Sequence, residues 1–226
     1  MSRVSLLILC VFTIAASAQI TVRFVPKLGN SPLQLTTGVY NCTNAKLVTI
    51  TMLKLYVTNI QFLNNNTVVW SEPHSYHLLN ADSPESFALT LNAPAALQYN
   101  TLRFNVGVDS TTTVAGVMGG DLDPTKGMYW TWQSGYINFK LEGSIPALPT
   151  RNHEFQFHIG GYAAPFNTLQ TVTLPCAQKR DVFIGMNLQQ FLDGVEINET
   201  HNIMSPNVKA VHAARLLPAI FTVQTP

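Results

Sequence analysis

The side chains best suited to binding a metal ion are two histidines in strand-like segments far apart in the chain. His158 stands near the end of the segment 154–159, whose alternate apolar residues would face a core. Its imidazole would then point away from that core, next to Gly160, where another group can approach the backbone closely. Imidazole is a ligand for copper and zinc. His77, in a second short strand, is the best candidate for another imidazole ligand.

None of the six histidines shows a spacing that is specific for a metal site. His74 and His77 are three residues apart, but in a strand they would face opposite sides. The sequence contains no HExxH, CxxC or EF-hand pattern. It therefore leaves open a second interpretation, in which each histidine is only a surface residue or a hydrogen-bonded one.

Three carboxylates flank the segment 108–124, which ends in a turn-rich run. Calcium takes oxygen ligands, so Asp109, Asp121 and Asp123 could bind it together with backbone carbonyls. Aspartate also stabilises turns by accepting hydrogen bonds from its own loop backbone. Both interpretations fit the sequence, and calcium stays a candidate ligand.

Aromatic side chains are concentrated in the segment 127–138, which holds two of the three tryptophans. Trp130 and Trp132 are two positions apart and would share one face of a strand. That face could belong to the core, to a platform for a sugar, or to the wall of a pocket. The chain has no GxSxG motif, and paired acids for glycoside hydrolysis cannot be picked out. We therefore expect a binding protein and not an enzyme.

Residues 1–18 have the pattern of a secretory signal peptide. Arg3 supplies the positive start, an apolar run over 4–14 follows, and small residues suit cleavage before Gln19. No later segment is apolar for long enough to cross a membrane. We expect export, followed by one β domain over residues 19–226.

Two cysteines remain after cleavage, Cys42 and Cys176. In an oxidising compartment two such thiols are expected to pair in a disulfide that closes a long loop. A bridge of that kind could stabilise the fold by roughly 4–5 kcal/mol in the chain-entropy model. A copper thiolate is the alternative, although no spacing in the sequence supports it.

The charge balance argues against nucleic acid as a partner. Removing residues 1–18 removes Arg3 and no acid, so the 13 basic residues become 12, against 12 acidic ones. Proteins that bind nucleic acid usually carry a basic excess. A chain that is 46% hydrophobic and only 11% charged is expected to fold and not to be disordered.

Apolar and polar residues alternate with a period of two through most of the chain. Strands are predicted over residues 20–25, 47–63 with a bend near Asn59, 67–70, 76–79, 102–108, 137–142, 155–159, 169–174, 181–188 and 221–223. Short helices are predicted over residues 93–97, 188–192 and 206–217. The pattern is typical of an all-β fold: a single antiparallel β-sandwich or barrel-like domain with a few short helices.

Several short motifs resemble, in the same order, those of the MbnP-like family of exported copper-binding β proteins. The motifs are Leu53–Ile60, Tyr76–Leu79, Phe104–Ser110, Gly120–Pro124, Gly127–Trp132, Gly135–Gly143 and Phe157–Gly161. With the strands around them, they cover nearly all of the chain after the signal peptide. Each motif is weak by itself, and their combination is specific.

The resemblance implies a periplasmic or cell-surface protein of a Gram-negative-type bacterium that acquires, buffers or transfers copper. His77 and His158 occupy the positions of the histidine ligands, and two imidazoles suit Cu(I). Tyr76, Trp130 and Trp132 would form a surrounding wall that excludes water. Family members are often encoded beside MbnH, a di-haem protein that resembles peroxidases, and such a protein is the implied partner.

Better-studied relatives look like copper binders that also use a tryptophan oxidised to kynurenine. In some of them this residue lies two positions before the first histidine, where the present chain has Ser75. Trp70 is the nearest upstream tryptophan and is the implied candidate for modification. The departure leaves open an alternative function, a metal-free binding or interaction module of the same fold with a protein or glycan partner.

Overall fold

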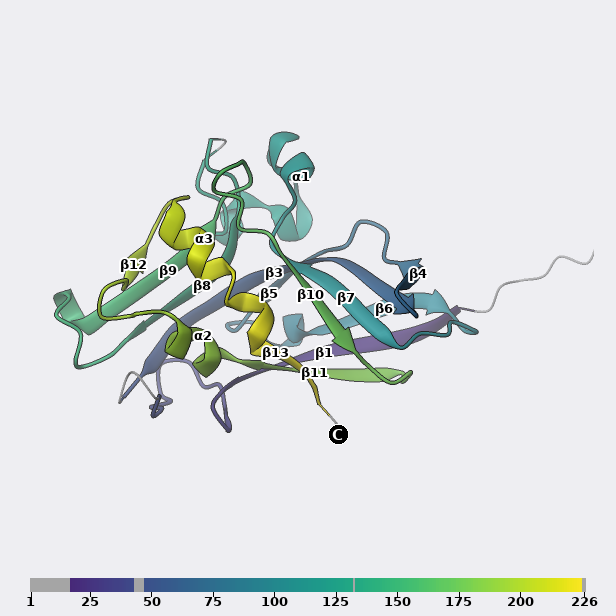
Figure 1. Ribbon diagram of the computed structural model, residues 1–226, viewed down its shortest axis with the longest axis horizontal. Helices are drawn as coiled ribbons and strands as arrows, with labels where there is room; N and C mark the ends of the chain where they lie inside the picture. The colour runs from purple at the N-terminus through teal and green to yellow at the C-terminus, as the bar shows by residue number, and fades with distance from the viewer. Residues whose placement is uncertain (1–16, 43–46, 132, 225–226) are drawn as a thin grey trace, which may run out of the picture.

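The computed structural model describes residues 17–42, 47–131 and 133–224 (Figure 1). Its strands are β1 (Ser17–Leu28), β2 (Ser31–Pro32), β3 (Thr49–Asn64), β4 (Thr67–Ser71), β5 (Tyr76–Asn80), β6 (Ala88–Pro94), β7 (Thr101–Val106), β8 (Ile137–Ser144), β9 (Glu154–Gly160), β10 (Gln170–Pro175), β11 (Asp181–Asn187), β12 (Asn202–Ile203) and β13 (Phe221–Gln224). Its helices are α1 (Ser110–Val114), α2 (Leu188–Gly194) and α3 (Val208–Ala214), with 3₁₀ segments η1 (Pro84–Phe87), η2 (Gly120–Leu122), η3 (Pro124–Lys126), η4 (Arg151–His153) and η5 (Leu217–Ile220). Strands dominate, which confirms the predicted all-β class.

The strands form two sheets that pack as a β-sandwich, as predicted. The first sheet has the order β13-β11-β1-β2, with β6 also paired to β1. The second has the order β10-β7-β3-β8-β9-β12, with β4 and β5 also paired to β3. Most neighbours are antiparallel, but β1 pairs with β11, and β9 with β12, in parallel.

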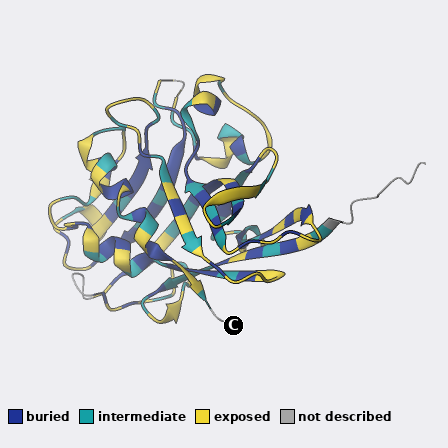
Figure 2. Ribbon diagram, turned by 45° about the vertical axis from the view of Figure 1, so that its right-hand side comes forward, coloured by how far each residue is buried: buried dark blue, intermediate teal, exposed yellow. Residues whose placement is uncertain are grey.

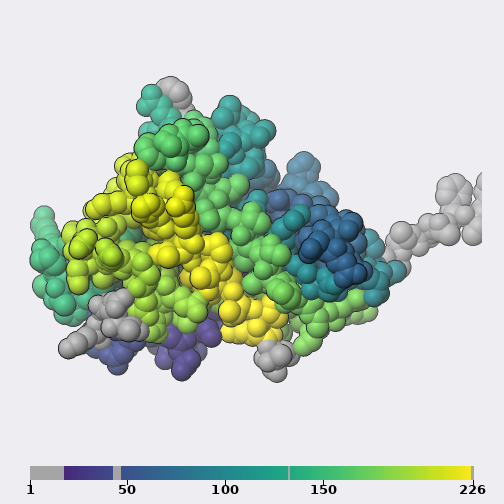
Figure 3. Space-filling model, viewed as in Figure 1, coloured from purple at the N-terminus to yellow at the C-terminus, as the bar shows by residue number. Residues whose placement is uncertain are grey.

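The main core lies between the two sheets, where buried side chains gather (Figure 2). Val22 and Phe24 of β1 are buried while Arg23 is exposed, as a half-buried strand requires. Helix α2 packs against β1 and η5, and α3 packs against β9. The C-terminal segment that holds α3 and η5 crosses the face shown in Figure 3. No helix in the described ranges is long and apolar enough to span a membrane.

Strand β3, with 16 residues, organises the second sheet. β4 and β5 pair along one side of it, and β7 and β8 pair along the other. Asn59 has a left-handed φ of 51°, where the register against β7 shifts between Thr58 and Gln61. The predicted bend near Asn59 is therefore confirmed.

A second, smaller core lies on the outer face of the second sheet, beneath the segment 107–136. We call it the outer cluster; its buried members are Tyr56, Leu78, Val108, Leu122, Met128, Tyr136 and Ile137. The rings of Tyr56 and Tyr136 meet edge to face at 5.7 Å. Their hydroxyls donate to the carbonyls of Asp121 (3.0 Å) and Leu122 (3.1 Å), respectively. These bonds fix the covering segment on the sheet.

The prediction of a helical turn over residues 93–97 is wrong. β6 continues to Pro94, and a turn then follows in which the Leu97 N–H donates to the Pro94 carbonyl (3.0 Å). Pairing of β6 with β1 overrides the helical preference of the local alanines. β1 begins at Ser17, so it includes the last two residues of the predicted signal peptide.

Candidate functional site

His158 lies on β9 and points to the outer face of the second sheet, as expected from the alternation. Its direct cross-strand neighbour on β8 is Lys140, while Phe157 and Ile159 on either side belong to the main core. The His158 Nε2 atom lies 2.6 Å from Glu142 Oε1, and the side chain is only 8% exposed. Glu142 could not be identified as this partner beforehand, because the register of β8 against β9 cannot be read from a single sequence.

The protonation of His158 follows from these contacts. Burial lowers the pKa of His158 below its ordinary value, the hydrogen bond to Glu142 opposes this, and nearby Lys140 adds to the lowering. The imidazole is therefore neutral near pH 7. A carboxylate only accepts, so Nε2 carries the proton and Nδ1 carries the lone pair.

The indole of Trp130 lies against Gly160, two residues beyond His158 on β9. Gly160 is on the same face of β9 as His158, and a Cβ there would sit 2.8 Å from Trp130 Cζ3 and 2.5 Å from the Tyr136 carbonyl oxygen. Gly160 is therefore required for this close approach. Trp130 itself packs against the outer cluster, and its backbone N–H donates to the Gly135 carbonyl (3.1 Å).

The expectation that Trp130 and Trp132 share one face of a strand is not met at Trp130. Trp130 lies in a tight loop closed by the isolated bridge between Tyr129 and Tyr136, and not in a strand. Trp132 lies outside the described residues. The glycine and aromatic content of the segment was a signal for this loop, because it permits a tight turn over a close-packed surface.

His77 lies on the edge strand β5 and also pairs with a carboxylate. Its Nε2 atom is 2.8 Å from Glu72 Oε2, and the side chains of His77 and Glu72 are 23% and 14% exposed. The Ser75 hydroxyl donates to the same carboxylate oxygen (2.6 Å) and accepts the Ile60 N–H (2.9 Å). Ser75, which stands where some relatives have tryptophan, is thus buried within this network.

The structure does not bring the two histidines together. His77 pairs with Val57, on the core side of β3, whereas His158 shares the outer face with its neighbour Lys140 and, through it, Lys54. Three strand spacings also separate β5 from β9, roughly 14 Å. One ion ligated by both imidazoles would require the sheet to rearrange.

Tyr76 points to the outer face of the second sheet, on the side opposite to its chain neighbour His77. Its hydroxyl lies 3.1 Å from Asp109 Oδ2 and 2.6 Å from Thr112 Oγ1. Burial raises the pKa of Tyr76, and the Asp109 charge adds to this. It lines a surface pocket of about 390 Å³ together with Asp109 and Glu72.

The three candidate calcium ligands each have a separate structural role. Asp109 caps α1 by accepting the Thr112 N–H (2.8 Å), and Asp123 accepts the Thr125 N–H (2.8 Å). The Asp121 carboxylate accepts the Leu78 N–H (3.0 Å) and the Lys126 ammonium (2.6 Å). In the part of the chain that the structure describes, no three His, Cys, Asp or Glu residues group as a metal site.

Hydrogen bonding explains the acidity of two of these carboxyls. Burial alone would raise the pKa of Asp109, but hydrogen bonds from Thr112 and Tyr76 outweigh it and lower that pKa. Hydrogen bonds from Thr125 lower the pKa of Asp123. Both groups are thus stabilised as carboxylates by the loop that they shape.

Trp70 on β4 packs into the main core and not next to either histidine. Its ring lies 5.6 Å from that of Phe62, its cross-strand neighbour on β3. His77 pairs with Val57, five positions away along β3. The residue implied as the candidate for modification is therefore a packing residue in this fold.

The predicted disulfide between Cys42 and Cys176 is wrong, because both cysteines are free and buried. Cys42 lies just before the start of β3, where Tyr40 bridges Val48. The Cys176 N–H donates to the Asn100 carbonyl, and the Asn100 N–H donates to the Leu63 carbonyl. Cys176 therefore lies near the other end of β3. The 15 residue steps from Val48 to Leu63 extend roughly 50 Å, and a disulfide needs Cα atoms within about 7 Å.

Comparisons with known proteins agree with this architecture. The sequence model of the MbnP family matches residues 17–206. The solved structure of MbnP from Methylosinus trichosporium superposes with a TM-score of 0.67 at 16% identity, covering 87% of each chain. At that identity the likeness establishes the fold alone. None of the curated proteins compared with the chain matches its sequence.

Proposed function

Because this chain belongs to the MbnP family, we propose that it is an exported copper-binding protein that acquires, buffers or transfers copper. The pairing of each candidate imidazole with a carboxylate supports the proposal most directly: His158 with Glu142, and His77 with Glu72. Metal-ligating histidines generally donate their second ring N–H to such a partner, which fixes the tautomer and raises ligand basicity. Each histidine would then offer Nδ1 to copper.

His158 is the principal ligand in this proposal. Its lowered pKa keeps the imidazole neutral, which is the form that binds metal. Its side chain is only 8% exposed, which limits the access of water. A soft ion such as Cu(I) accepts imidazole and tolerates few ligands. The chain offers one imidazole at this place, so an incoming donor would complete the coordination during transfer.

His77 would hold copper separately. The two imidazoles lie on opposite faces of one sheet, so each acts as an independent, single-histidine site. The Ser75 hydroxyl and the Glu72 carboxylate fix the orientation of His77 but do not add a second nitrogen ligand. We therefore propose weaker binding there.

Cu(I) competition titrations against the chelator bathocuproine disulfonate test this proposal on the chain without residues 1–18. His158→Gln is expected to weaken the tighter site at least about tenfold, equivalent to about 1.4 kcal/mol. His77→Gln should lower the Cu(I) affinity of the weaker site only. His212→Gln, an exposed histidine, is the matched control. Unchanged copper binding in the double variant would rule out both sites.

We propose binding and not catalysis as the activity. Cys42 and Cys176, the strongest nucleophiles in principle, are buried, and burial raises the pKa of each thiol to about 11. Export to the periplasm or cell surface, and partnership with a di-haem peroxidase-like protein, complete the proposal. Native mass spectrometry and co-purification from the host would test these two points.

A metal-free interaction module is the second candidate. The separation of His77 from His158, and the buried hydrogen bonds of Ser75, favour it. A protein or glycan would then contact the aromatic wall formed by Tyr129 and Trp130. A chain that stays metal-free after incubation with Cu(I), but captures a partner, would support this function over copper binding.

A further inference from the structure

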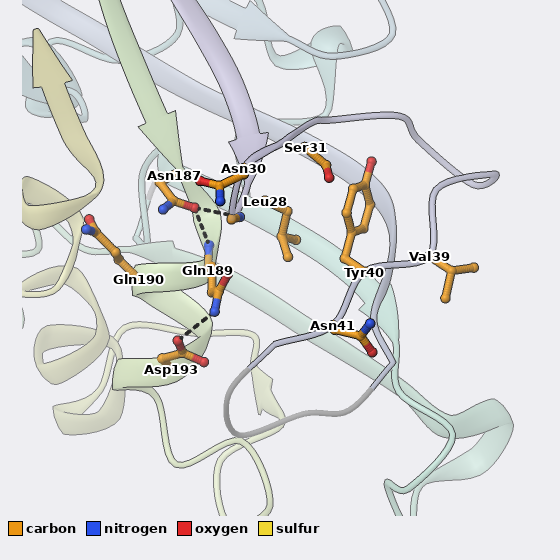
Figure 4. A pocket seen from close by; sticks show the side chains of 11 residues that line it. Leu28, Asn30, Ser31, Val39, Tyr40, Asn41, Asn187, Gln189, Gln190 and Asp193 are labelled. Carbon is orange, nitrogen blue, oxygen red and sulfur yellow. Dashed lines mark hydrogen bonds between the residues drawn. The ribbon is translucent and has the colours of Figure 1, made fainter. Parts of the chain in front are cut away.

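A surface pocket of about 540 Å³ lies at one end of the first sheet, and it includes neither histidine (Figure 4). Its walls come from the β1–β2 turn, residues 39–41, the end of β11 and helix α2. The volume lies in the range of small-molecule sites. The function proposed above leaves this pocket unexplained.

Carboxamides dominate the lining of the pocket. The amide and acidic side chains are those of Asn30, Asn41, Asn187, Gln189, Gln190 and Asp193. Among the lining residues that the structure describes there is no lysine or arginine, and Asp193 adds a carboxylate, so these residues do not suit an anion. Each carboxamide supplies both donors and an acceptor, as neighbouring hydroxyl groups of a sugar require. This chemistry matches a neutral, hydroxyl-rich ligand.

One wall is held in place by hydrogen bonds within the protein. Asn187 Oδ1 accepts the N–H groups of Gly29 (2.9 Å) and Gln189 (3.3 Å). Gln189 Nε2 donates to Asp193 Oδ2 (3.2 Å). Gly29 has a left-handed φ of 63°, which glycine adopts without strain, in the turn between β1 and β2. This wall is therefore organised before any ligand binds.

Tyr40 forms the facing wall (Figure 4). Its hydroxyl donates to the Pro32 carbonyl (3.0 Å) and accepts the Gln34 N–H (2.6 Å), which fixes the ring. The ring is only 7% exposed and belongs to the main core, so Tyr40 supports this wall and offers a ligand only a small apolar edge.

Three carboxamides remain available to a ligand. The side chains of Asn30, Asn41 and Gln190 are exposed and make no hydrogen bond with any residue that the structure describes. They extend from three separate segments of the wall. A ligand between them could exchange hydrogen bonds with all three without displacing a protein contact.

We propose that this pocket binds a neutral saccharide of mono- or disaccharide size. The fixed carboxamides Asn187 and Gln189 and the ring of Tyr40 shape the site, and Asn30, Asn41 and Gln190 bind the sugar hydroxyls. The proposal is independent of copper, because binding here neither requires nor excludes a metal at His158.

Calorimetric titration with maltose, cellobiose and N,N′-diacetylchitobiose tests the proposal on the chain without residues 1–18. At least one of these sugars is expected to bind, and Asn30→Ala plus Gln190→Ala to weaken it at least about tenfold. Asn92→Ala plus Gln98→Ala, which changes two exposed carboxamides outside the pocket, should bind as the parent does. Thermal unfolding verifies that both variants fold.

Three results would overturn the assignment. They are absence of binding by all three sugars, equal affinity of the pocket and control variants, and competition by calcium, which would show that the oxygen set holds a cation. None of these results bears on copper binding at His158, so the two proposals fail separately.

Discussion

Lys54 and Lys140 are cross-strand neighbours on the outer face of the second sheet, and their ammonium groups bind adjacent carbonyls of one turn. Lys54 Nζ donates to Lys126 O (3.3 Å), and Lys140 Nζ donates to Gly127 O (3.4 Å). These carbonyls stand at the end of η3, three to four residues before Trp130. The sheet thus anchors the segment that places the indole of Trp130 against Gly160, two residues beyond His158.

Lys140→Met should loosen this segment while it keeps most of the apolar stem. The free energy of unfolding is expected to fall by up to about 1 kcal/mol, the usual net contribution of a hydrogen bond. Amide exchange over residues 124–131 should rise more than in the main core. Lys209→Met, an exposed change on α3, serves as the control. Equal exchange in the two variants would show that the anchor is not needed.

Gly160→Ala should destabilise the fold, because its Cβ would meet the Tyr136 carbonyl at 2.5 Å and the Trp130 ring at 2.8 Å. Overpacking of this kind costs about 1–3 kcal/mol. Gly119→Ala meets nothing within 4 Å and is the matched control. Urea unfolding of both variants checks the prediction. Similar midpoints would mean that the loop moves aside freely.

Acidification should destabilise the protein through His158. Burial holds the folded pKa of His158 below 6.5, and the Glu142 hydrogen bond opposes this only in part, so the unfolded chain takes up the proton first. The stability that the neutral imidazole contributes is present in full above the unfolded pKa. It is lost as the pH falls below about 6.5 toward the folded value.

Urea unfolding at about pH 7.5 and pH 5.5 measures this loss. His158→Gln keeps a donor for Glu142 but cannot titrate, so its free energy of unfolding should fall less over the same interval. Equal pH dependence in both proteins would refute the assignment.

Cys42 and Cys176 should both be free thiols. Reductant is expected to leave the melting temperature of the protein unchanged, since no bridge between them constrains the unfolded state. Cys42 and Cys176 are buried, and burial raises each pKa to about 11, so alkylation near pH 8 should be slow until urea is added. A melting temperature that falls when reductant is added would contradict this prediction and support a disulfide between the two cysteines.

Local pattern predicted most of the strands and the outward orientation of His158. Alternation within 154–159 assigns each side chain to one face, and that information is entirely local. The bend at Asn59 was also readable, because asparagine tolerates the left-handed backbone found there.

The pairing and register of distant strands could not be predicted from the sequence. Whether His77 shares a face with His158 depends on the register of three strand pairs, and a shift of one residue reverses a face. The disulfide prediction failed for a related reason: it rested on an expected oxidising compartment, whereas β3 separates Cys42 from Cys176. Ala93 was misassigned because its partner, β1, lies far away in sequence.

The parallel pairing of β1 with β11 has a consequence for the order in which the protein assembles. Thr21 pairs with Asp181 and Lys27 with Asn187. One edge of β1 can therefore form its hydrogen bonds only after residues 181–187 have been synthesised. When the polypeptide emerges amino end first, β6 can join β1 early, whereas β11 arrives late. Such distant pairing is slow to form. The first sheet is therefore expected to be completed only when β11 joins β1 beside the β1–β6 pair.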